Sequence, residues 1–151
     1  MKRSVVLVAL ATWLALCLPL TAEETTLAIV VSKSNHVDQL SMRDLVRIYQ
    51  GDLEKWPDGQ RIVGLDYSSS SSLRVQFYRR VLQAEPDQEF FHPGSPIPFQ
   101  AVLLSSETSI RRFVARIPNA IGYLPASMAD DTVKIIKING RLPHEDAYAL
   151  Q

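Results

Sequence analysis

The chain has 151 residues, with 16 basic and 16 acidic side chains, three histidines and one cysteine. The balanced charge and the lack of any basic block argue against a nucleic-acid-binding protein. The length is sufficient for one domain with a substantial hydrophobic core.

Residues 1–22 have the pattern of a secretory signal peptide. Lys2 and Arg3 precede an apolar run over residues 5–18, and residues 20–22 offer a cleavage point. The apolar run is shorter than the roughly 20 residues of a membrane-spanning helix, so we expect cleavage rather than a permanent anchor.

Cleavage after residue 22 predicts a periplasmic protein of one domain, residues 23–151. That protein would have no cysteine, because Cys17 is the only one in the chain, and so neither a disulfide nor thiol chemistry. The alternative is lipidation of Cys17, but lipid attachment prefers a small residue where Leu16 stands.

The first elements expected after the signal peptide are a buried strand and a capped helix. Residues 27–31, LAIVV, form a continuous apolar run that is typical of a strand buried on both faces. Ser41 has the side chain of a helix N-cap, and Asp44 follows three residues later, as in a capping box. The helix is expected to end at Gly51, and residues 61–65 predict a second strand.

A run of five serines, residues 68–72, separates this second strand from a second helix. Leu73, Phe77 and Val81 give that helix an apolar face. Hydroxyl groups and free backbone N–H groups would therefore collect at a helix N-terminus directly after a strand, where anions bind well. The alternative is a flexible, solvated serine loop. The candidate ligand-binding residues are Ser69, Ser70, Ser71, Ser72 and Arg74.

Residues 84–100, the proline-rich segment, are expected to be irregular because four prolines exclude a long helix. A short helix over residues 86–91 is compatible with a proline in its first turn. Phe90, Phe91 and Phe99 are expected to dock the segment on the core. The alternative is an exposed aromatic patch for a partner.

The last part of the chain predicts a third helix, which begins at Ser105 or Ser106, and strands at 120–124 and 133–138. Strands and helices thus alternate along the chain, apart from the proline-rich segment. Such alternation predicts an α/β layered fold with a mixed or largely parallel sheet.

Two motifs in this order resemble those of the PstS-like family, the periplasmic phosphate-binding proteins of ABC transporters. The resemblance covers about residues 26–140 and implies a three-layer single lobe of a type 2 periplasmic-binding-protein-like fold, with a mixed sheet flanked by helices. It also implies a non-catalytic protein without a cofactor. The matching stretches are Ile48-Tyr49-Gln50-Gly51, Trp56-Pro57-Asp58-Gly59, Ile62-Val63-Gly64-Leu65 and residues 113–123, FVARIPNAIGY.

The resemblance implies phosphate or a related oxyanion as the ligand. In phosphate-binding relatives, an arginine and then a Ser-Gly-Thr triplet open the helix. Here Ser71 matches the serine, whereas Ser72 and Leu73 replace the glycine and the threonine, and Tyr67 stands near the position of the arginine. These departures, and a length that suits one of the family's two lobes, predict weak binding.

Two hypotheses follow. The first is a periplasmic solute-binding module linked to ABC-type transport or sensing. The second is an interaction or sensory module of the same fold that has lost its small ligand and docks on a membrane transporter or receptor. A homodimer that supplies the missing half of the site is compatible with either hypothesis.

No enzyme, metal site or nucleic-acid partner is expected. His36, His92 and His144 lie far apart in the sequence, without the paired spacing of metal ligands. The chain also contains neither a G-x-S-x-G elbow nor a G-x-x-x-x-G-K-[ST] phosphate loop.

Overall fold

The structure is a computed structural model, and it describes residues 25–151. The predicted signal peptide and Cys17 lie outside the described residues. In the described part of the chain, no helix is long and apolar enough to cross a membrane.

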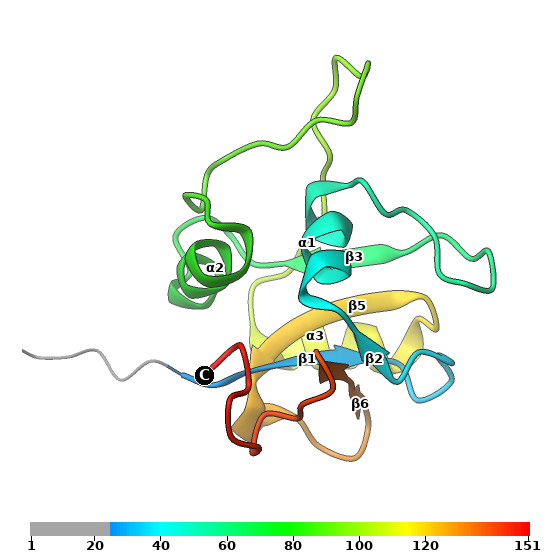
Figure 1. Cartoon of the computed structure of the whole chain (residues 1–151), viewed down its shortest axis with the longest axis vertical. Coiled ribbons are helices and arrows are strands. Elements are labelled where there is room, and N and C mark those ends of the chain that lie inside the picture. The colour runs from blue at the N-terminus through cyan, green and yellow to red at the C-terminus, as the bar shows by residue number, and fades with distance from the viewer. Residues whose placement is uncertain (1–24) are drawn as a thin grey trace, which may run out of the picture.

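A five-stranded mixed sheet, in the order β4-β3-β5-β1-β6, forms the centre of the molecule (Figure 1). β1 (Leu27–Val31) is antiparallel to both of its neighbours, β5 (Ala120–Pro125) and β6 (Lys134–Ile135). β3 (Val63–Asp66) is parallel to β5 and to the edge strand β4 (Val102–Leu103). The predicted mixed sheet is therefore confirmed, and every residue of β1 and β5 is buried.

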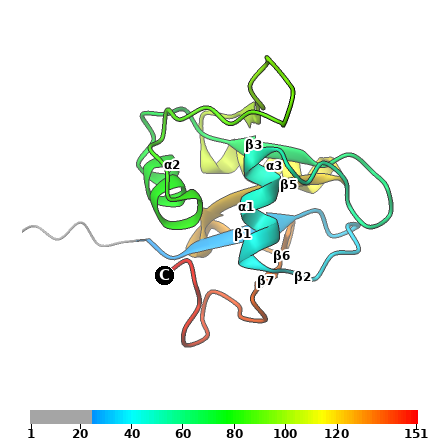
Figure 2. The same cartoon turned by 45° about the horizontal axis from the view of Figure 1, so that its top comes forward.

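Helices cover both faces of this sheet, as Figure 2 shows with α1 in front of β5 and α3 behind it. These helices are α1 (Met42–Gln50), α2 (Ser72–Phe77) and α3 (Glu107–Arg116). A π-helical turn, η1 (Tyr78–Leu82), continues α2 without a break.

Two adjacent residues of β5 show how the layers pack. Gly122 faces α3 so closely that a Cβ atom there would lie 2.7 Å from the side chain of Ile110. Tyr123 points to the opposite face, where its ring stacks on Phe77 of α2 with 4.0 Å between the centroids. Because neighbouring side chains of a strand point to opposite faces, the sheet lies between two helical layers. The predicted three-layer α/β architecture is confirmed.

The caps predicted for α1 are confirmed. The Ser41 hydroxyl accepts a hydrogen bond from the Asp44 N–H at 3.0 Å and donates one to the Asp44 carboxylate at 2.9 Å. Gly51 ends the helix with φ +84°, a left-handed conformation that favours glycine.

The proline-rich segment is irregular, as predicted, and the short helix that the sequence allowed over residues 86–91 does not form. The chain makes only a turn there, from the Gln88 N–H to the Glu85 carbonyl, and then has no regular secondary structure up to Phe90. The Phe90 carbonyl accepts a hydrogen bond from the Phe99 N–H at 2.7 Å, so the segment folds back on itself as a hairpin-like loop. This pairing and the bridge between Phe91 and Pro98 hold the segment as a loop.

Three minor elements complete the described chain. β2 (Gln39–Leu40) and β7 (Lys137–Ile138) pair in parallel as a separate two-stranded sheet. A single 3₁₀ turn, η2 (Ala126–Met128), follows β5.

Candidate functional site

The candidate site lies where β3 ends and α2 begins. A cavity of about 370 Å³ opens there, between these elements and the proline-rich segment. The residues that line it include acidic, basic, hydroxyl and aromatic side chains: Tyr49, Asp66, Ser69, Arg74, Tyr78, Asp87, Glu89, Phe90, Phe99 and Leu103.

Two of the five predicted ligand-binding residues, Ser69 and Arg74, line this cavity. The other three, Ser70, Ser71 and Ser72, lie at the helix start but do not line it. The structure thus divides the five residues between the cavity and the start of α2, and their role in ligand binding stays a prediction.

The helix end has free donors. Ser71 is the N-cap of α2, yet its hydroxyl makes no capping hydrogen bond. The first N–H that finds an acceptor inside the helix is that of Val75, which donates to the Ser71 carbonyl at 3.0 Å. The preceding N–H groups, those of residues 72–74, therefore have no acceptor within the helix. An anion placed at this turn would accept hydrogen bonds from them.

Arg74 lies in the first turn of α2, and its side chain already has several partners within the protein. Its guanidinium lies 3.1 Å from the Asp66 carboxylate and 4.4 Å from the centre of the Tyr78 ring. It also donates to the carbonyls of Tyr67 and Pro86, at 2.8 and 2.7 Å. Arg74 therefore fixes the helix start to the proline-rich segment, and its role as a ligand donor stays a prediction.

Asp66, which the sequence did not single out, is the centre of the polar network beneath the cavity. Its buried carboxylate accepts hydrogen bonds from the hydroxyls of Tyr123 and Tyr78, at 2.5 and 2.8 Å. The Tyr67 N–H donates to the same group at 2.8 Å. The available signal was a carboxylate at the end of a buried strand, because such a group needs buried partners.

Burial also changes the acidity of these groups. It raises the pKa of Asp66 above its usual value, while the hydrogen bond from Tyr123 and the charge of Arg74 oppose this rise. Burial and the nearby Asp66 charge raise the pKa of Tyr123 and Tyr78 as well. Both phenols therefore stay protonated at neutral pH and remain donors to the carboxylate.

Aromatic rings form the rigid support of the site. Tyr123 lies between Phe77, on which it stacks, and Tyr67, whose ring meets it edge to face at 5.2 Å. The Tyr67 hydroxyl donates to the Tyr123 carbonyl at 3.1 Å.

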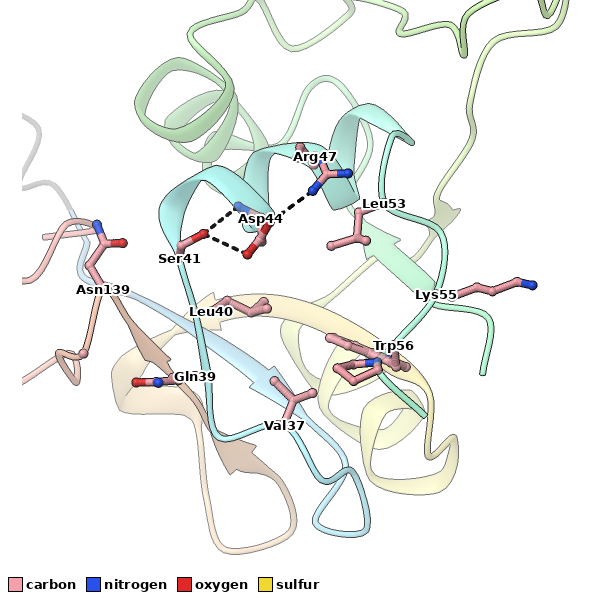
Figure 3. A pocket seen from close by; sticks show the side chains of 12 residues that line it. Val37, Gln39, Leu40, Ser41, Asp44, Arg47, Leu53, Lys55, Trp56 and Asn139 are labelled. Atoms are coloured by element: carbon pink, nitrogen blue, oxygen red, sulfur yellow. Dashed lines mark hydrogen bonds and ion pairs between the residues drawn. The ribbon is translucent and has the colours of Figure 1, made fainter. Parts of the chain in front are cut away.

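A second groove, with a volume of about 670 Å³, lies between α1 and the β2–β7 pair (Figure 3). Its polar groups bond to one another: Ser41 to Asp44, and Asp44 to Arg47 at 3.4 Å. The indole N–H of Trp56 donates to the Asn119 carbonyl at 3.0 Å. Ser41, Asp44, Arg47 and Trp56 are therefore engaged within the protein, whereas Gln39 and Lys55 also line the groove. Within residues 25–151 there is no group of three metal-ligating side chains.

The chain is similar to known proteins in sequence and in fold. No protein-family model matches the chain. The chain is 25% identical over 122 residues to the phosphate-binding protein PstS of Bacillus subtilis, a match that spans 78% of this chain and 37% of the relative.

Solved structures show the same likeness in fold. An ABC-type phosphate transport receptor from Vibrio cholerae superimposes with a TM-score of 0.73 and 24% identity over 83% of this chain and 53% of the receptor. PstS from Borrelia burgdorferi gives a TM-score of 0.69 and 17% identity over 83% of this chain and 54% of that protein.

A phosphate-bound substrate-binding protein from Clostridium perfringens gives a TM-score of 0.63 at 24% identity, over 77% of this chain and 46% of that protein. The chain thus spans about half the length, or less, of the proteins that it matches. In sequence and in fold the chain is PstS-like: it resembles the phosphate-binding proteins of ABC transporters over part of their length.

Proposed function

We propose that the chain is a periplasmic solute-binding module that takes phosphate or a related oxyanion at the first turn of α2 and serves ABC-type transport or sensing. One observation carries the proposal: N–H groups without helical acceptors and an uncommitted Ser71 hydroxyl lie together at the end of β3. The proteins that the chain resembles are described as phosphate-binding. The proposed function has no catalytic step.

The ligand atoms expected to make contact are the oxygens of the anion. They would accept hydrogen bonds from the N–H groups of residues 72–74 and from the hydroxyls of Ser69 to Ser72. Arg74 would attract the anion through its charge. It would donate few hydrogen bonds to the anion, because its guanidinium is paired with Asp66.

The charges around the cavity predict weak binding. Asp66, Asp87 and Glu89 line it, against Arg74 as the single cation among the lining residues. A helix N-terminus contributes about 0.3–1 kcal/mol toward an anion, and up to about 2 kcal/mol in a partly buried site. This term alone falls short of the roughly −4 kcal/mol that corresponds to millimolar affinity, so we expect a dissociation constant no tighter than the order of millimolar. Tighter binding would require donors from outside residues 25–151.

Calorimetric titration with phosphate at low and moderate salt tests the proposal. The wild-type protein should give saturable heat, and Ser71→Asp should abolish it, because the new carboxylate takes the N–H groups and repels the anion. Ser127→Asp is the matched control, since Ser127 is an exposed serine in the short helix η2, outside the residues that line the cavity. No heat up to millimolar phosphate, or equal loss in both variants, would contradict the proposal.

The second hypothesis, a docking module without a small ligand, has support of its own. Exposed apolar side chains gather in and just after the proline-rich segment, at Phe91, Ile97, Val102 and Leu103. The homodimer that the sequence allows stays an open possibility, and sedimentation of the wild-type protein at several concentrations would test it.

A further inference from the structure

We infer that the free edge of the sheet at β4, with the adjoining proline-rich segment, is a docking surface for an extended, lysine- or arginine-bearing segment of a partner protein. This inference goes beyond the proposed oxyanion binding and does not depend on it. It would hold for a solute-binding protein and for a module without a small ligand alike.

The first observation is the clustering of exposed apolar side chains. Among the described residues, Phe91, Ile97, Val102 and Leu103 are 49%, 69%, 40% and 60% exposed, and Met128 is the remaining large hydrophobic side chain in this class. Single exposed apolar residues are common, whereas a concentration of them marks an interaction site. Four of the five therefore fall between residues 91 and 103, two in the proline-rich segment and two in the edge strand β4.

The second observation is the backbone of the edge strand. β4 ends the sheet on the β3 side, so no further strand of the described chain covers it. The Leu104 N–H donates to the Asp66 carbonyl on β3 at 2.8 Å. Because backbone groups alternate in direction along a strand, Leu103 directs its N–H and its carbonyl away from β3. An exposed edge with free backbone groups is a template for an added strand.

The third observation is the negative charge of the surface, which favours a basic partner over an acidic one. Residues 84–104 contain three acidic side chains, Glu85, Asp87 and Glu89, and no lysine or arginine. Glu85 is paired with Arg79 at 3.2 Å, whereas Asp87 and Glu89 make no ion pair with any described residue. These two acids line the same cavity as Leu103. A basic strand is therefore attracted, and a second copy of the same acidic surface is repelled.

The surface is also held in place before any partner arrives. Arg74 donates to the Pro86 carbonyl, and the Phe99 N–H donates to the Phe90 carbonyl. Phe99 packs so closely on α1 that a Cβ atom at Gly51 would lie 2.7 Å from its ring. A preformed surface loses little conformational entropy on binding, which favours docking.

A peptide titration tests the inference. The probe is a short peptide of alternating lysine and valine, added to isotope-labelled protein expressed from the full chain, with amide chemical shifts as the readout. We expect saturable shifts at residues 101–104 and 87–91. A peptide of alternating glutamate and valine should give none, and a central proline in the lysine peptide should weaken binding about tenfold, because proline lacks an N–H.

Variants of the protein make the test specific. Leu103→Pro removes the outward N–H without touching the bonds between β3 and β4, and should abolish binding. The double variant Asp87→Lys, Glu89→Lys should weaken binding about tenfold through charge repulsion. Asp131→Lys is the charge control, because Asp131 precedes β6 at the opposite edge of the sheet.

Three results would overturn the inference: equal binding of the acidic peptide, shifts centred on β6, or a dimer that forms through β4 in the absence of peptide. Titration of Ser71→Asp with the lysine peptide separates this inference from the proposed function, because Ser71 is the N-cap of α2 and lies outside the β4 edge. A variant that loses phosphate binding but keeps the lysine peptide would show that the two surfaces act independently.

Discussion

At the scale of single residues, Asp66 connects the parts of the site. Its buried carboxylate contacts three elements: β5 through Tyr123, the π-helical turn η1 through Tyr78, and the first turn of α2 through Arg74. A buried charge is stable only when it is paired and fully hydrogen-bonded, so each of these contacts carries a measurable share of the free energy of unfolding.

The substitution Tyr123→Phe removes one of these donors and keeps the ring stack with Phe77. We expect it to lower the free energy of unfolding by about 1.5–3 kcal/mol, the usual range for a hydrogen bond to a charged group. Urea denaturation followed by circular dichroism measures this value.

Tyr148→Phe is the matched control. The Tyr148 hydroxyl is buried near the Ile29 backbone but makes no hydrogen bond with the described residues. Its removal should therefore leave the stability unchanged or raise it, because no partner is lost. Equal losses in both variants would show that the hydrogen bond to Asp66 contributes nothing.

The residue scale also shows what the sequence alone could not provide. The serine run was recognised because a cap and its free N–H groups are local features. Arg74 was assigned to the ligand because its partners Asp66 and Pro86 lie 8 and 12 positions away along the chain, on other elements. Asp66 itself was passed over because the hydroxyls of Tyr78 and Tyr123 are brought to its carboxylate only by the tertiary fold.

At the scale of elements, the end of α1 is a packing site as well as a helix cap. Gly51 and Gly59 have nearly the same backbone conformation, with φ +84° and +86°. A Cβ atom at Gly51 would lie 2.7 Å from the Phe99 ring and 2.9 Å from His92, whereas nothing lies within 4 Å at Gly59.

Gly59→Ala should therefore cost about 1–2 kcal/mol, the penalty of a left-handed conformation for a residue with a Cβ atom. Gly51→Ala should cost about 1–3 kcal/mol more, because it also forces the proline-rich segment off α1. Thermal unfolding of the two variants measures the difference. Equal costs would mean that Phe99 does not pack on α1 as the structure describes.

Most elements were predictable because their signals are local. The N-cap and C-cap of α1, the buried run of β1 and the second and third helices are all read from neighbouring residues. The β4 edge strand depends on its pairing with β3, and the hairpin-like loop depends on the hydrogen bond between Phe99 and Phe90. Local sequence patterns do not report pairings between such distant residues. The same lack of long-range information left a short helix over residues 86–91 open as a possibility.

At the scale of the whole molecule, the tyrosines make stability sensitive to alkaline pH. Burial raises the pKa of all five: Tyr49, Tyr67, Tyr78, Tyr123 and Tyr148. The folded chain then keeps protons that the unfolded chain releases near pH 10. The stabilisation is therefore complete below about pH 10 and is lost as the pH rises further.

Above pH 10, each such tyrosine should lower the free energy of unfolding by about 1.4 kcal/mol per pH unit. Denaturation curves between pH 8 and 12, with phenolate absorbance recorded on the same samples, measure this slope. Stability that stays flat while phenolate absorbance appears in the folded state would contradict the buried positions of the tyrosines.

The central claim is that an oxyanion binds at the first turn of α2. The most direct measurement is a titration of isotope-labelled protein with phosphate, in which the amide signals of residues 69–75 are followed individually. The account predicts saturable shifts that are largest at Ser72, Leu73 and Arg74, with a dissociation constant on the order of millimolar. No shift up to that concentration, or shifts centred on the groove between α1 and the β2–β7 pair, would contradict it.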